Sequence, residues 1–85
     1  MGLLSGVTKS VELLLSLNTK LDFADRDAMH AYLENENRTP GLHRYGLHPQ
    51  NSTVLILVGE QPEVGEIANY LLEKGYCTRI INRLS

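Results

Sequence analysis

The segment from residue 52 to residue 85 constrains the fold more than any other part of the chain. Residues 53–58 form an uninterrupted run of β-branched and aliphatic side chains, which is typical of a strand buried on both faces. Pro62 and Gly75 stand where a helix begins and ends, and residues 77–84 alternate between polar and apolar as an edge strand does. The sequence therefore predicts a βαβ unit over residues 53–84.

Two helices are expected before this unit, as a helical pair over residues 4–35. Apolar residues up to Leu17 recur at helical spacing, which predicts a first helix over about 4–17 with a broad apolar face. Asp22 is expected to cap a second helix over residues 23–35. The apolar face of this second helix is narrow, which indicates a position at the surface of the domain.

Residues 36–52 show no clear periodicity and include two prolines and two glycines. A structureless segment of this length is unusual in a compact domain, so we expect either a short strand at 42–47 or a binding loop. The predicted fold is one small domain over residues 1–85, of class α/β or α+β, with the order α-α-β-α-β. Two parallel strands are not stable alone, so a third strand, a second copy or a larger partner has to complete the sheet.

Composition excludes several classes of function. The chain has 85 residues, of which 42% are apolar, a net charge of −2 and one cysteine. The charge gives no electrostatic basis for binding nucleic acid or an anionic membrane, and no apolar run is long enough to span a membrane. A single cysteine allows no internal disulfide, and no secretory signal is recognisable. We therefore expect a cytoplasmic protein.

The βαβ unit, whose apolar strand stops at Gly59, resembles the first unit of a Rossmann dinucleotide-binding fold. That resemblance implies a phosphate site at the N-terminus of the following helix. The two further glycines of the fingerprint fall on Gln61 and Val64, however, and Glu60 and Glu63 place negative charge where phosphate would lie. The sequence therefore predicts a structural βαβ unit without a bound cofactor.

His43, Arg44, Tyr45 and His48 form the densest polar group in the sequence. Tyrosine, histidine and arginine suit the centre of a protein interface, so we expect these residues to contact a partner. Two histidines five residues apart could also meet at a metal ion, but a metal site would still need a third ligand such as His30 or an acid.

Arg79 and Arg83 share one face of the last predicted strand. Arginines at a sheet edge commonly prevent unwanted strand pairing. Together with Arg44, they could instead hold a carboxylate or a phosphate. Cys77, at the start of this strand, is expected to be a small buried apolar residue.

No complete catalytic set is recognisable, so enzymatic activity is not expected. The broad apolar surface predicts a protein-interaction module: a small regulator, inhibitor or assembly factor that acts on a larger partner, or a homo-oligomer. The residues expected to contact the partner are His43, Arg44, Tyr45, His48, Arg79 and Arg83. A binding protein for a small anionic ligand such as a nucleotide or phosphate is the alternative, and a minimal hydrolase or metal enzyme built on His43 or His48 is a third possibility.

Overall fold

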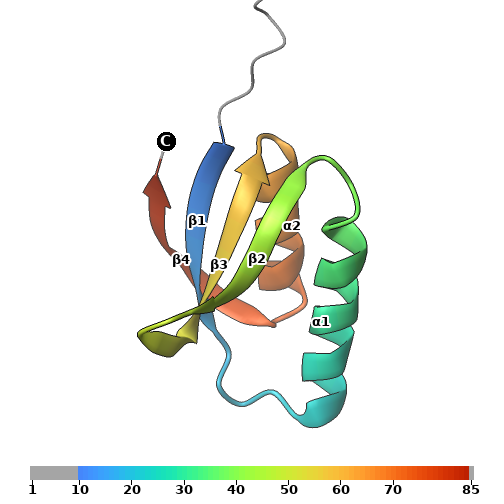
Figure 1. Cartoon of the computed structure of the whole chain (residues 1–85). Coiled ribbons are helices and arrows are strands. Elements are labelled where there is room, and N and C mark those ends of the chain that lie inside the picture. The colour runs from blue at the N-terminus through green and yellow to red at the C-terminus, as the bar shows by residue number, and fades with distance from the viewer. Residues whose placement is uncertain (1–9, 85) are drawn as a thin grey trace, which may run out of the picture.

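The computed structural model describes residues 10–84, and the side chains of residues 10–81. The protein is a small compact α+β domain with the element order β-α-β-β-α-β (Figure 1). The elements are β1 (Ser10–Leu17), α1 (Phe23–Glu36), β2 (Leu42–His48), β3 (Asn51–Glu60), α2 (Glu63–Glu73) and β4 (Cys77–Leu84). The four strands form one antiparallel sheet in the order β2-β3-β1-β4, which is the split βαβ arrangement.

The prediction of a helix over residues 4–17 is wrong for residues 10–17, and its first residues lie outside the described part of the chain. Residues 10–17 form β1, which pairs with β3 on one side and β4 on the other. Leu13 and Leu15 point to the helices and are 1% and 0% exposed. The pairing of both backbone edges outweighs the helical preference of a leucine-rich segment, since tertiary context commonly overrides intrinsic propensity.

The predicted order α-α-β-α-β is therefore corrected to β-α-β-β-α-β. The segments β3, α2 and β4 exist as predicted, but β3 and β4 are not neighbours in the sheet. They run in the same direction, and β1 lies antiparallel between them. The likeness to a Rossmann unit does not extend to the sheet, because the open, mostly parallel sheet of that fold is absent from residues 10–84.

The prediction of a surface helix with an Asp22 cap is confirmed. The side chain of Asp22 accepts a hydrogen bond from the backbone N–H of Asp25 at 2.8 Å, which satisfies one of the free donors at the helix start. Leu33 is the one residue of α1 that is fully buried. The helix therefore covers the sheet with a narrow strip of its surface.

A strand at 42–47 was one of two expectations for the middle segment, and the structure confirms it as β2. β2 and β3 form a hairpin in which His48 faces Asn51 across a two-residue turn. β2 begins against Gly59, where an added Cβ would collide with the carbonyl oxygen of Gly41. Gly59 is thus required for the close approach of β2 and β3. Strand packing therefore accounts for this glycine, which in the sequence resembled the first glycine of a dinucleotide-binding fingerprint.

The C-terminus of α2 follows the predicted pattern, with Gly75 at the C′ position. Gly75 has a φ of 78°, a conformation in which side chains are strained. Its N–H donates to the carbonyl of Leu72 at 3.1 Å, and the N–H of Tyr76 donates to that of Leu71 at 3.0 Å. These two bonds are the Schellman motif, and they turn the chain directly into β4.

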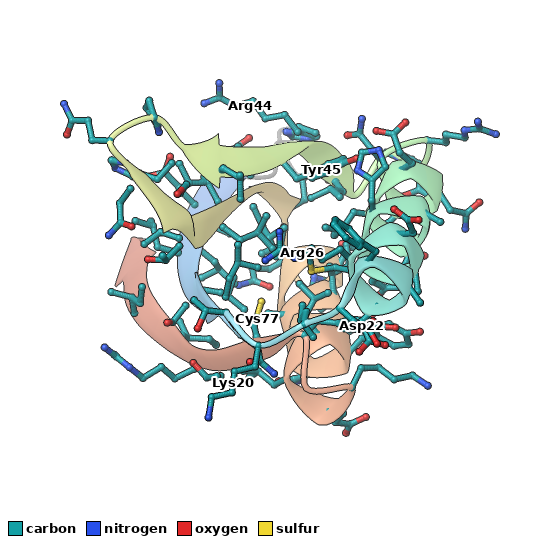
Figure 2. All side chains as sticks on the ribbon, turned by 90° about the horizontal axis from the view of Figure 1, so that it is seen from below. Lys20, Asp22, Arg26, Arg44, Tyr45 and Cys77 are labelled. Carbon is teal, nitrogen blue, oxygen red and sulfur yellow. The ribbon has the colours of Figure 1, made fainter. Side chains whose placement is uncertain are left out.

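Both helices lie on one face of the sheet (Figures 1 and 2), and the core fills the space between them. Leu57, Val64, Ala68 and Leu71 are each 0% exposed. Cys77 is 2% exposed within the same cluster, as predicted for a small apolar residue (Figure 2). The opposite face of the sheet carries no helix among residues 10–84.

We predict that Leu15→Ala lowers the free energy of unfolding by about 2–5 kcal/mol, because it leaves a cavity at a fully buried position of β1, an inner strand of the sheet. Urea unfolding followed by circular dichroism measures the change. Leu47→Ala is the matched control, because Leu47 also lies on a strand but is 54% exposed. Equal costs for the two substitutions would contradict the position of β1 in the core.

Candidate functional site

The face of the sheet opposite the helices is named the open face here. Its residues form rows in which neighbouring strands place their side chains side by side. These rows are Arg44–Val58–Glu12, Gly46–Ile56–Leu14 and Val54–Ser16–Arg79, and the pair Glu60–Ser10 lies beyond the first of them. The centre of the face is apolar, and its charged groups are Arg44 and Glu12 in the first row, Arg79 in the third row and Glu60 at the end of β3.

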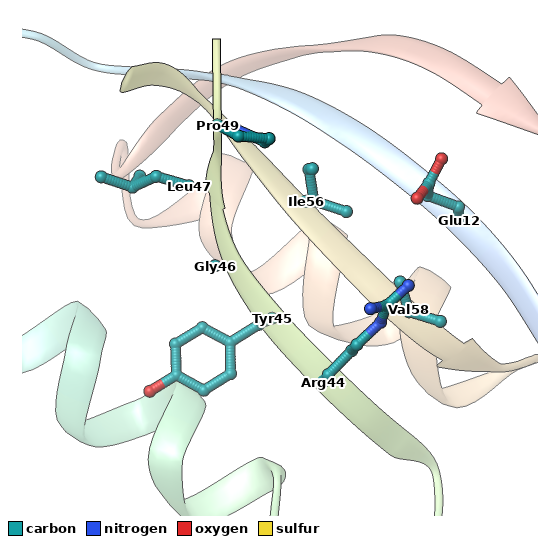
Figure 3. A pocket seen from close by; sticks show the side chains of 8 residues that line it. All are labelled: Glu12, Arg44, Tyr45, Gly46, Leu47, Pro49, Ile56 and Val58. Carbon is teal, nitrogen blue, oxygen red and sulfur yellow. The ribbon is translucent and has the colours of Figure 1, made fainter. Parts of the chain in front are cut away.

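A shallow hollow of about 220 Å³ lies on the open face (Figure 3). Ile56 and Val58 form part of its lining, and Glu12 and Arg44 stand at its sides. The hollow exists partly because Gly46 contributes no side chain, and an atom added there would meet nothing within 4 Å. The open face can therefore receive an apolar group from another molecule between two opposite charges.

The structure divides the predicted group of His43, Arg44, Tyr45 and His48. All four lie on β2 rather than in a loop. Arg44 projects to the open face, whereas Tyr45 projects to the helix layer (Figure 3). His48 is at the hairpin turn, where its Nδ1 accepts the N–H of Gln50 at 3.0 Å. The strand places the two histidines about 15 Å apart, so they cannot share one metal ion.

The predicted arginine group is likewise divided. Arg44 lies on β2 and Arg79 on β4, which are the two edge strands of the sheet. Three strand spacings separate them, a distance of at least about 14 Å. The backbone therefore does not place the two arginines side by side. Arg83 also lies on β4, but its side chain is outside the described part of the structure.

A hydrogen-bonded chain that the sequence did not indicate runs through His43. The residue lies at an irregularity of β2, between Leu42 and Arg44. Its Nε2 is 3.0 Å from a carboxylate oxygen of Glu60, and its Nδ1 is 3.2 Å from the Oγ of Ser10. Serine, histidine and carboxylate are the components of a nucleophilic triad. Here all three are open to water, which weakens the contacts, and the hollow of the open face does not include Ser10.

Tyr45 joins β2 to α1 through polar contacts. Its hydroxyl donates to a carboxylate oxygen of Glu34 at 2.5 Å and lies 3.2 Å from the Nδ1 of His30. Burial, followed by the hydrogen bond and the charge of Glu34, raises the pKa of Tyr45 from 10.0 to about 12. A cavity of about 500 Å³ lies beside this contact, between α1 and β2. The phenol therefore stays protonated and connects the helix to the edge strand.

Comparison with protein-family models, with curated proteins and with solved structures finds no match for this chain. Within residues 10–84, no helix is long and apolar enough to span a membrane. In the same part of the chain, no three histidine, cysteine or acidic side chains gather as a metal site would require. The geometry of the open face therefore carries the functional argument.

Glu34→Gln is expected to lower the pKa of Tyr45 from about 12 toward its ordinary value of 10.0, without reaching it, because burial remains. The tyrosinate absorbance in a pH titration measures the shift, and Tyr45→Phe identifies the signal. Asp27→Asn, at another exposed acid of α1, is the control. Because the raised pKa favours folding below pH 10, this contribution is lost as the pH rises toward 12. An unchanged titration would contradict the Tyr45–Glu34 contact.

The Cys77 thiol is expected to react with a disulfide reagent only as fast as the domain opens. Burial raises its pKa from 9.0 to about 11, so little of the reactive thiolate is present near neutral pH. Labelling rates measured at increasing urea concentrations test this expectation. The control is Ser52→Cys in a Cys77→Ala background, which presents an exposed thiol. Equal rates in the absence of urea would contradict the buried position.

Proposed function

We propose that this domain is a protein-interaction module that binds its partner through the open face of its sheet. The observation that carries the proposal is that β3 is apolar on both sides. Leu55 and Leu57 face the helices and are 2% and 0% exposed. Val54, Ile56 and Val58 occupy the alternate positions, which face away from the helices.

An antiparallel sheet with one covered face ordinarily alternates between apolar and polar residues. β1 follows that rule more closely than β3, because Glu12 and Ser16 share its outer side with Leu14. The apolar outer side of β3 is typical of a strand that has a second layer packed over it. Ile56 and Val58 are half-buried in the single chain, and a partner would remove the rest of their surface from water.

The open face also has the composition of a small interface. An apolar centre surrounded by polar residues is the usual arrangement at a protein contact. Arg44 and Arg79, two of the residues expected from the sequence to contact a partner, both lie at its margin. His43 lies beside the same face and contacts Glu60, whereas Tyr45 faces the helix layer and His48 lies at the hairpin turn. These positions support a protein partner more than an anionic ligand, because Arg44 and Arg79 lie on opposite edge strands of the sheet.

We predict that Ile56→Asp abolishes partner binding and leaves the domain folded, because it places a charge at the centre of the open face. The chain is tagged in its native setting, and the proteins that co-purify in stoichiometric amount are compared between wild type and variant. Circular dichroism and urea unfolding verify that the variant folds.

Phe23→Asp is the matched control, because Phe23 is apolar and 84% exposed but lies at the start of α1. Binding that is lost with Phe23→Asp and retained with Ile56→Asp would contradict the proposal. The absence of any stoichiometric partner, including a second copy, would contradict it as well.

A further inference from the structure

We propose that the cavity between α1 and β2 binds a small molecule that joins one positively charged amine to an apolar body. This goes beyond the proposed function and does not depend on it, because the cavity lies on the helix side of the sheet. α1 stands beside β2 at the border of the helix layer (Figure 1) and buries only Leu33 completely. Its narrow contact leaves a cavity of about 500 Å³, which is within the range of small-molecule sites, about 300–1,000 Å³.

Much of the cavity wall is apolar. Leu33 and Leu55 line it and are 1% and 2% exposed, so a ligand in the cavity reaches the core. Leu47 pairs with Leu55 and projects from the same side of β2 as Tyr45 (Figure 3). Leu47 is nevertheless 54% exposed, because α1 does not cover it. An apolar ligand body therefore removes from water a side chain that the fold itself leaves open.

Three polar side chains lie together at one part of this wall, namely His30, Glu34 and Tyr45. His30 and Glu34 are one helical turn apart on α1, and Tyr45 contacts both. The Tyr45 hydroxyl has one hydrogen, which it donates to Glu34. In the neutral form of His30, Nδ1 therefore donates to the hydroxyl oxygen, 3.2 Å away, and Nε2 is left as an acceptor.

The atoms that these side chains leave available are acceptors. Within residues 10–81, no hydrogen bond is donated to the second carboxylate oxygen of Glu34 or to Nε2 of His30. Asn37 also lines the cavity, but its amide nitrogen donates to the carbonyl oxygens of Leu42 and His43, each at 3.1 Å. A protonated amine supplies up to three donors together with the positive charge that the Glu34 carboxylate attracts. The chemistry of the wall therefore fits an amine better than an alcohol or an acid.

The charges around the cavity set the number of amines at one. Glu34 is the acid of its wall, and the side chain of Arg44 projects away from it to the open face (Figure 3). Beyond Met29 and Leu47, which line both spaces, a hollow of about 320 Å³ continues along α1 and is bordered by Arg26. A ligand that extends into this hollow meets a positive charge there. A single amine on an apolar body therefore fits the whole groove, and a diamine does not.

Probes that differ in one group test the proposal on the full purified chain: 4-phenylbutylamine, 4-phenylbutanol and 4-phenylbutyrate. Amide shifts in two-dimensional NMR spectra give both the Kd and the position of each probe. At about pH 8, histidine side chains are ordinarily neutral and the amine is charged. We expect the amine to bind with a Kd of about 1 mM or below, at least about threefold tighter than the alcohol, with shifts in α1 and β2. The carboxylate is expected to bind most weakly.

Substitutions then assign the two parts of the site. Glu34→Gln is expected to weaken binding of the amine about threefold to tenfold and to leave binding of the alcohol within about twofold. Glutamine still accepts from Tyr45 but carries no charge, and the factor is modest because Glu34 is exposed. Leu47→Ser is expected to weaken both probes at least about threefold, since it removes part of the apolar wall. Glu73→Gln, at an exposed acid of α2, is the control.

Three results would overturn the proposal. The first is the absence of shifts with the amine up to about 20 mM. The second is an amine that binds no tighter than the alcohol or the carboxylate, or that Glu34→Gln does not weaken. The third is a set of shifts confined to the open face. The comparison of the probes needs only the wild-type chain, so it decides even if a variant fails to fold. Failure here leaves the proposed function standing, because capture of a protein through Ile56 is measured separately.

Discussion

The structure depends on the insertion of β1 between β3 and β4. β3 and β4 run in the same direction, and each presents a backbone edge to the space between them. β1 satisfies both edges at once by antiparallel pairing, and it sends Leu13 and Leu15 into the core. Without it, the domain would hold a hairpin and a separate strand, each too small to bury an apolar face.

Much of the fold follows from local sequence, and β1 shows where local sequence is insufficient. Asp22 marks the start of α1, and Pro62 and Gly75 mark the two ends of α2. The pattern of apolar residues predicts β4. In β1, apolar residues alternate with Ser10, Glu12 and Ser16, but Leu14 interrupts the alternation. The resulting leucine run matches helical spacing equally well. The requirement for a strand between β3 and β4 decides between the two, and that requirement arises from residues far along the chain.

The candidate site was predictable only in part for the same reason. Arg44 and Arg79 were expected at an interface because of their residue type, and the structure places both at the open face. Glu12 was missed because it was assigned to a helix, and Ser10 and Glu60 were missed because only the sheet brings them to His43. The apolar outer side of β3 was visible in the sequence, as an uninterrupted run of aliphatic residues.

The pairing of β1 with β4 joins segments that are distant in the chain. Glu12 faces Leu84 and Leu17 faces Cys77, so the paired residues are separated by 72 and 60 positions, the differences of their numbers. Contacts of such long range slow folding, because most of the chain has to be ordered before they form. During synthesis, one edge of β1 stays unpaired until β4 has left the ribosome. Through that interval an apolar strand edge is open to other chains, and the speed of closure by β4 determines how long the nascent protein is exposed to aggregation.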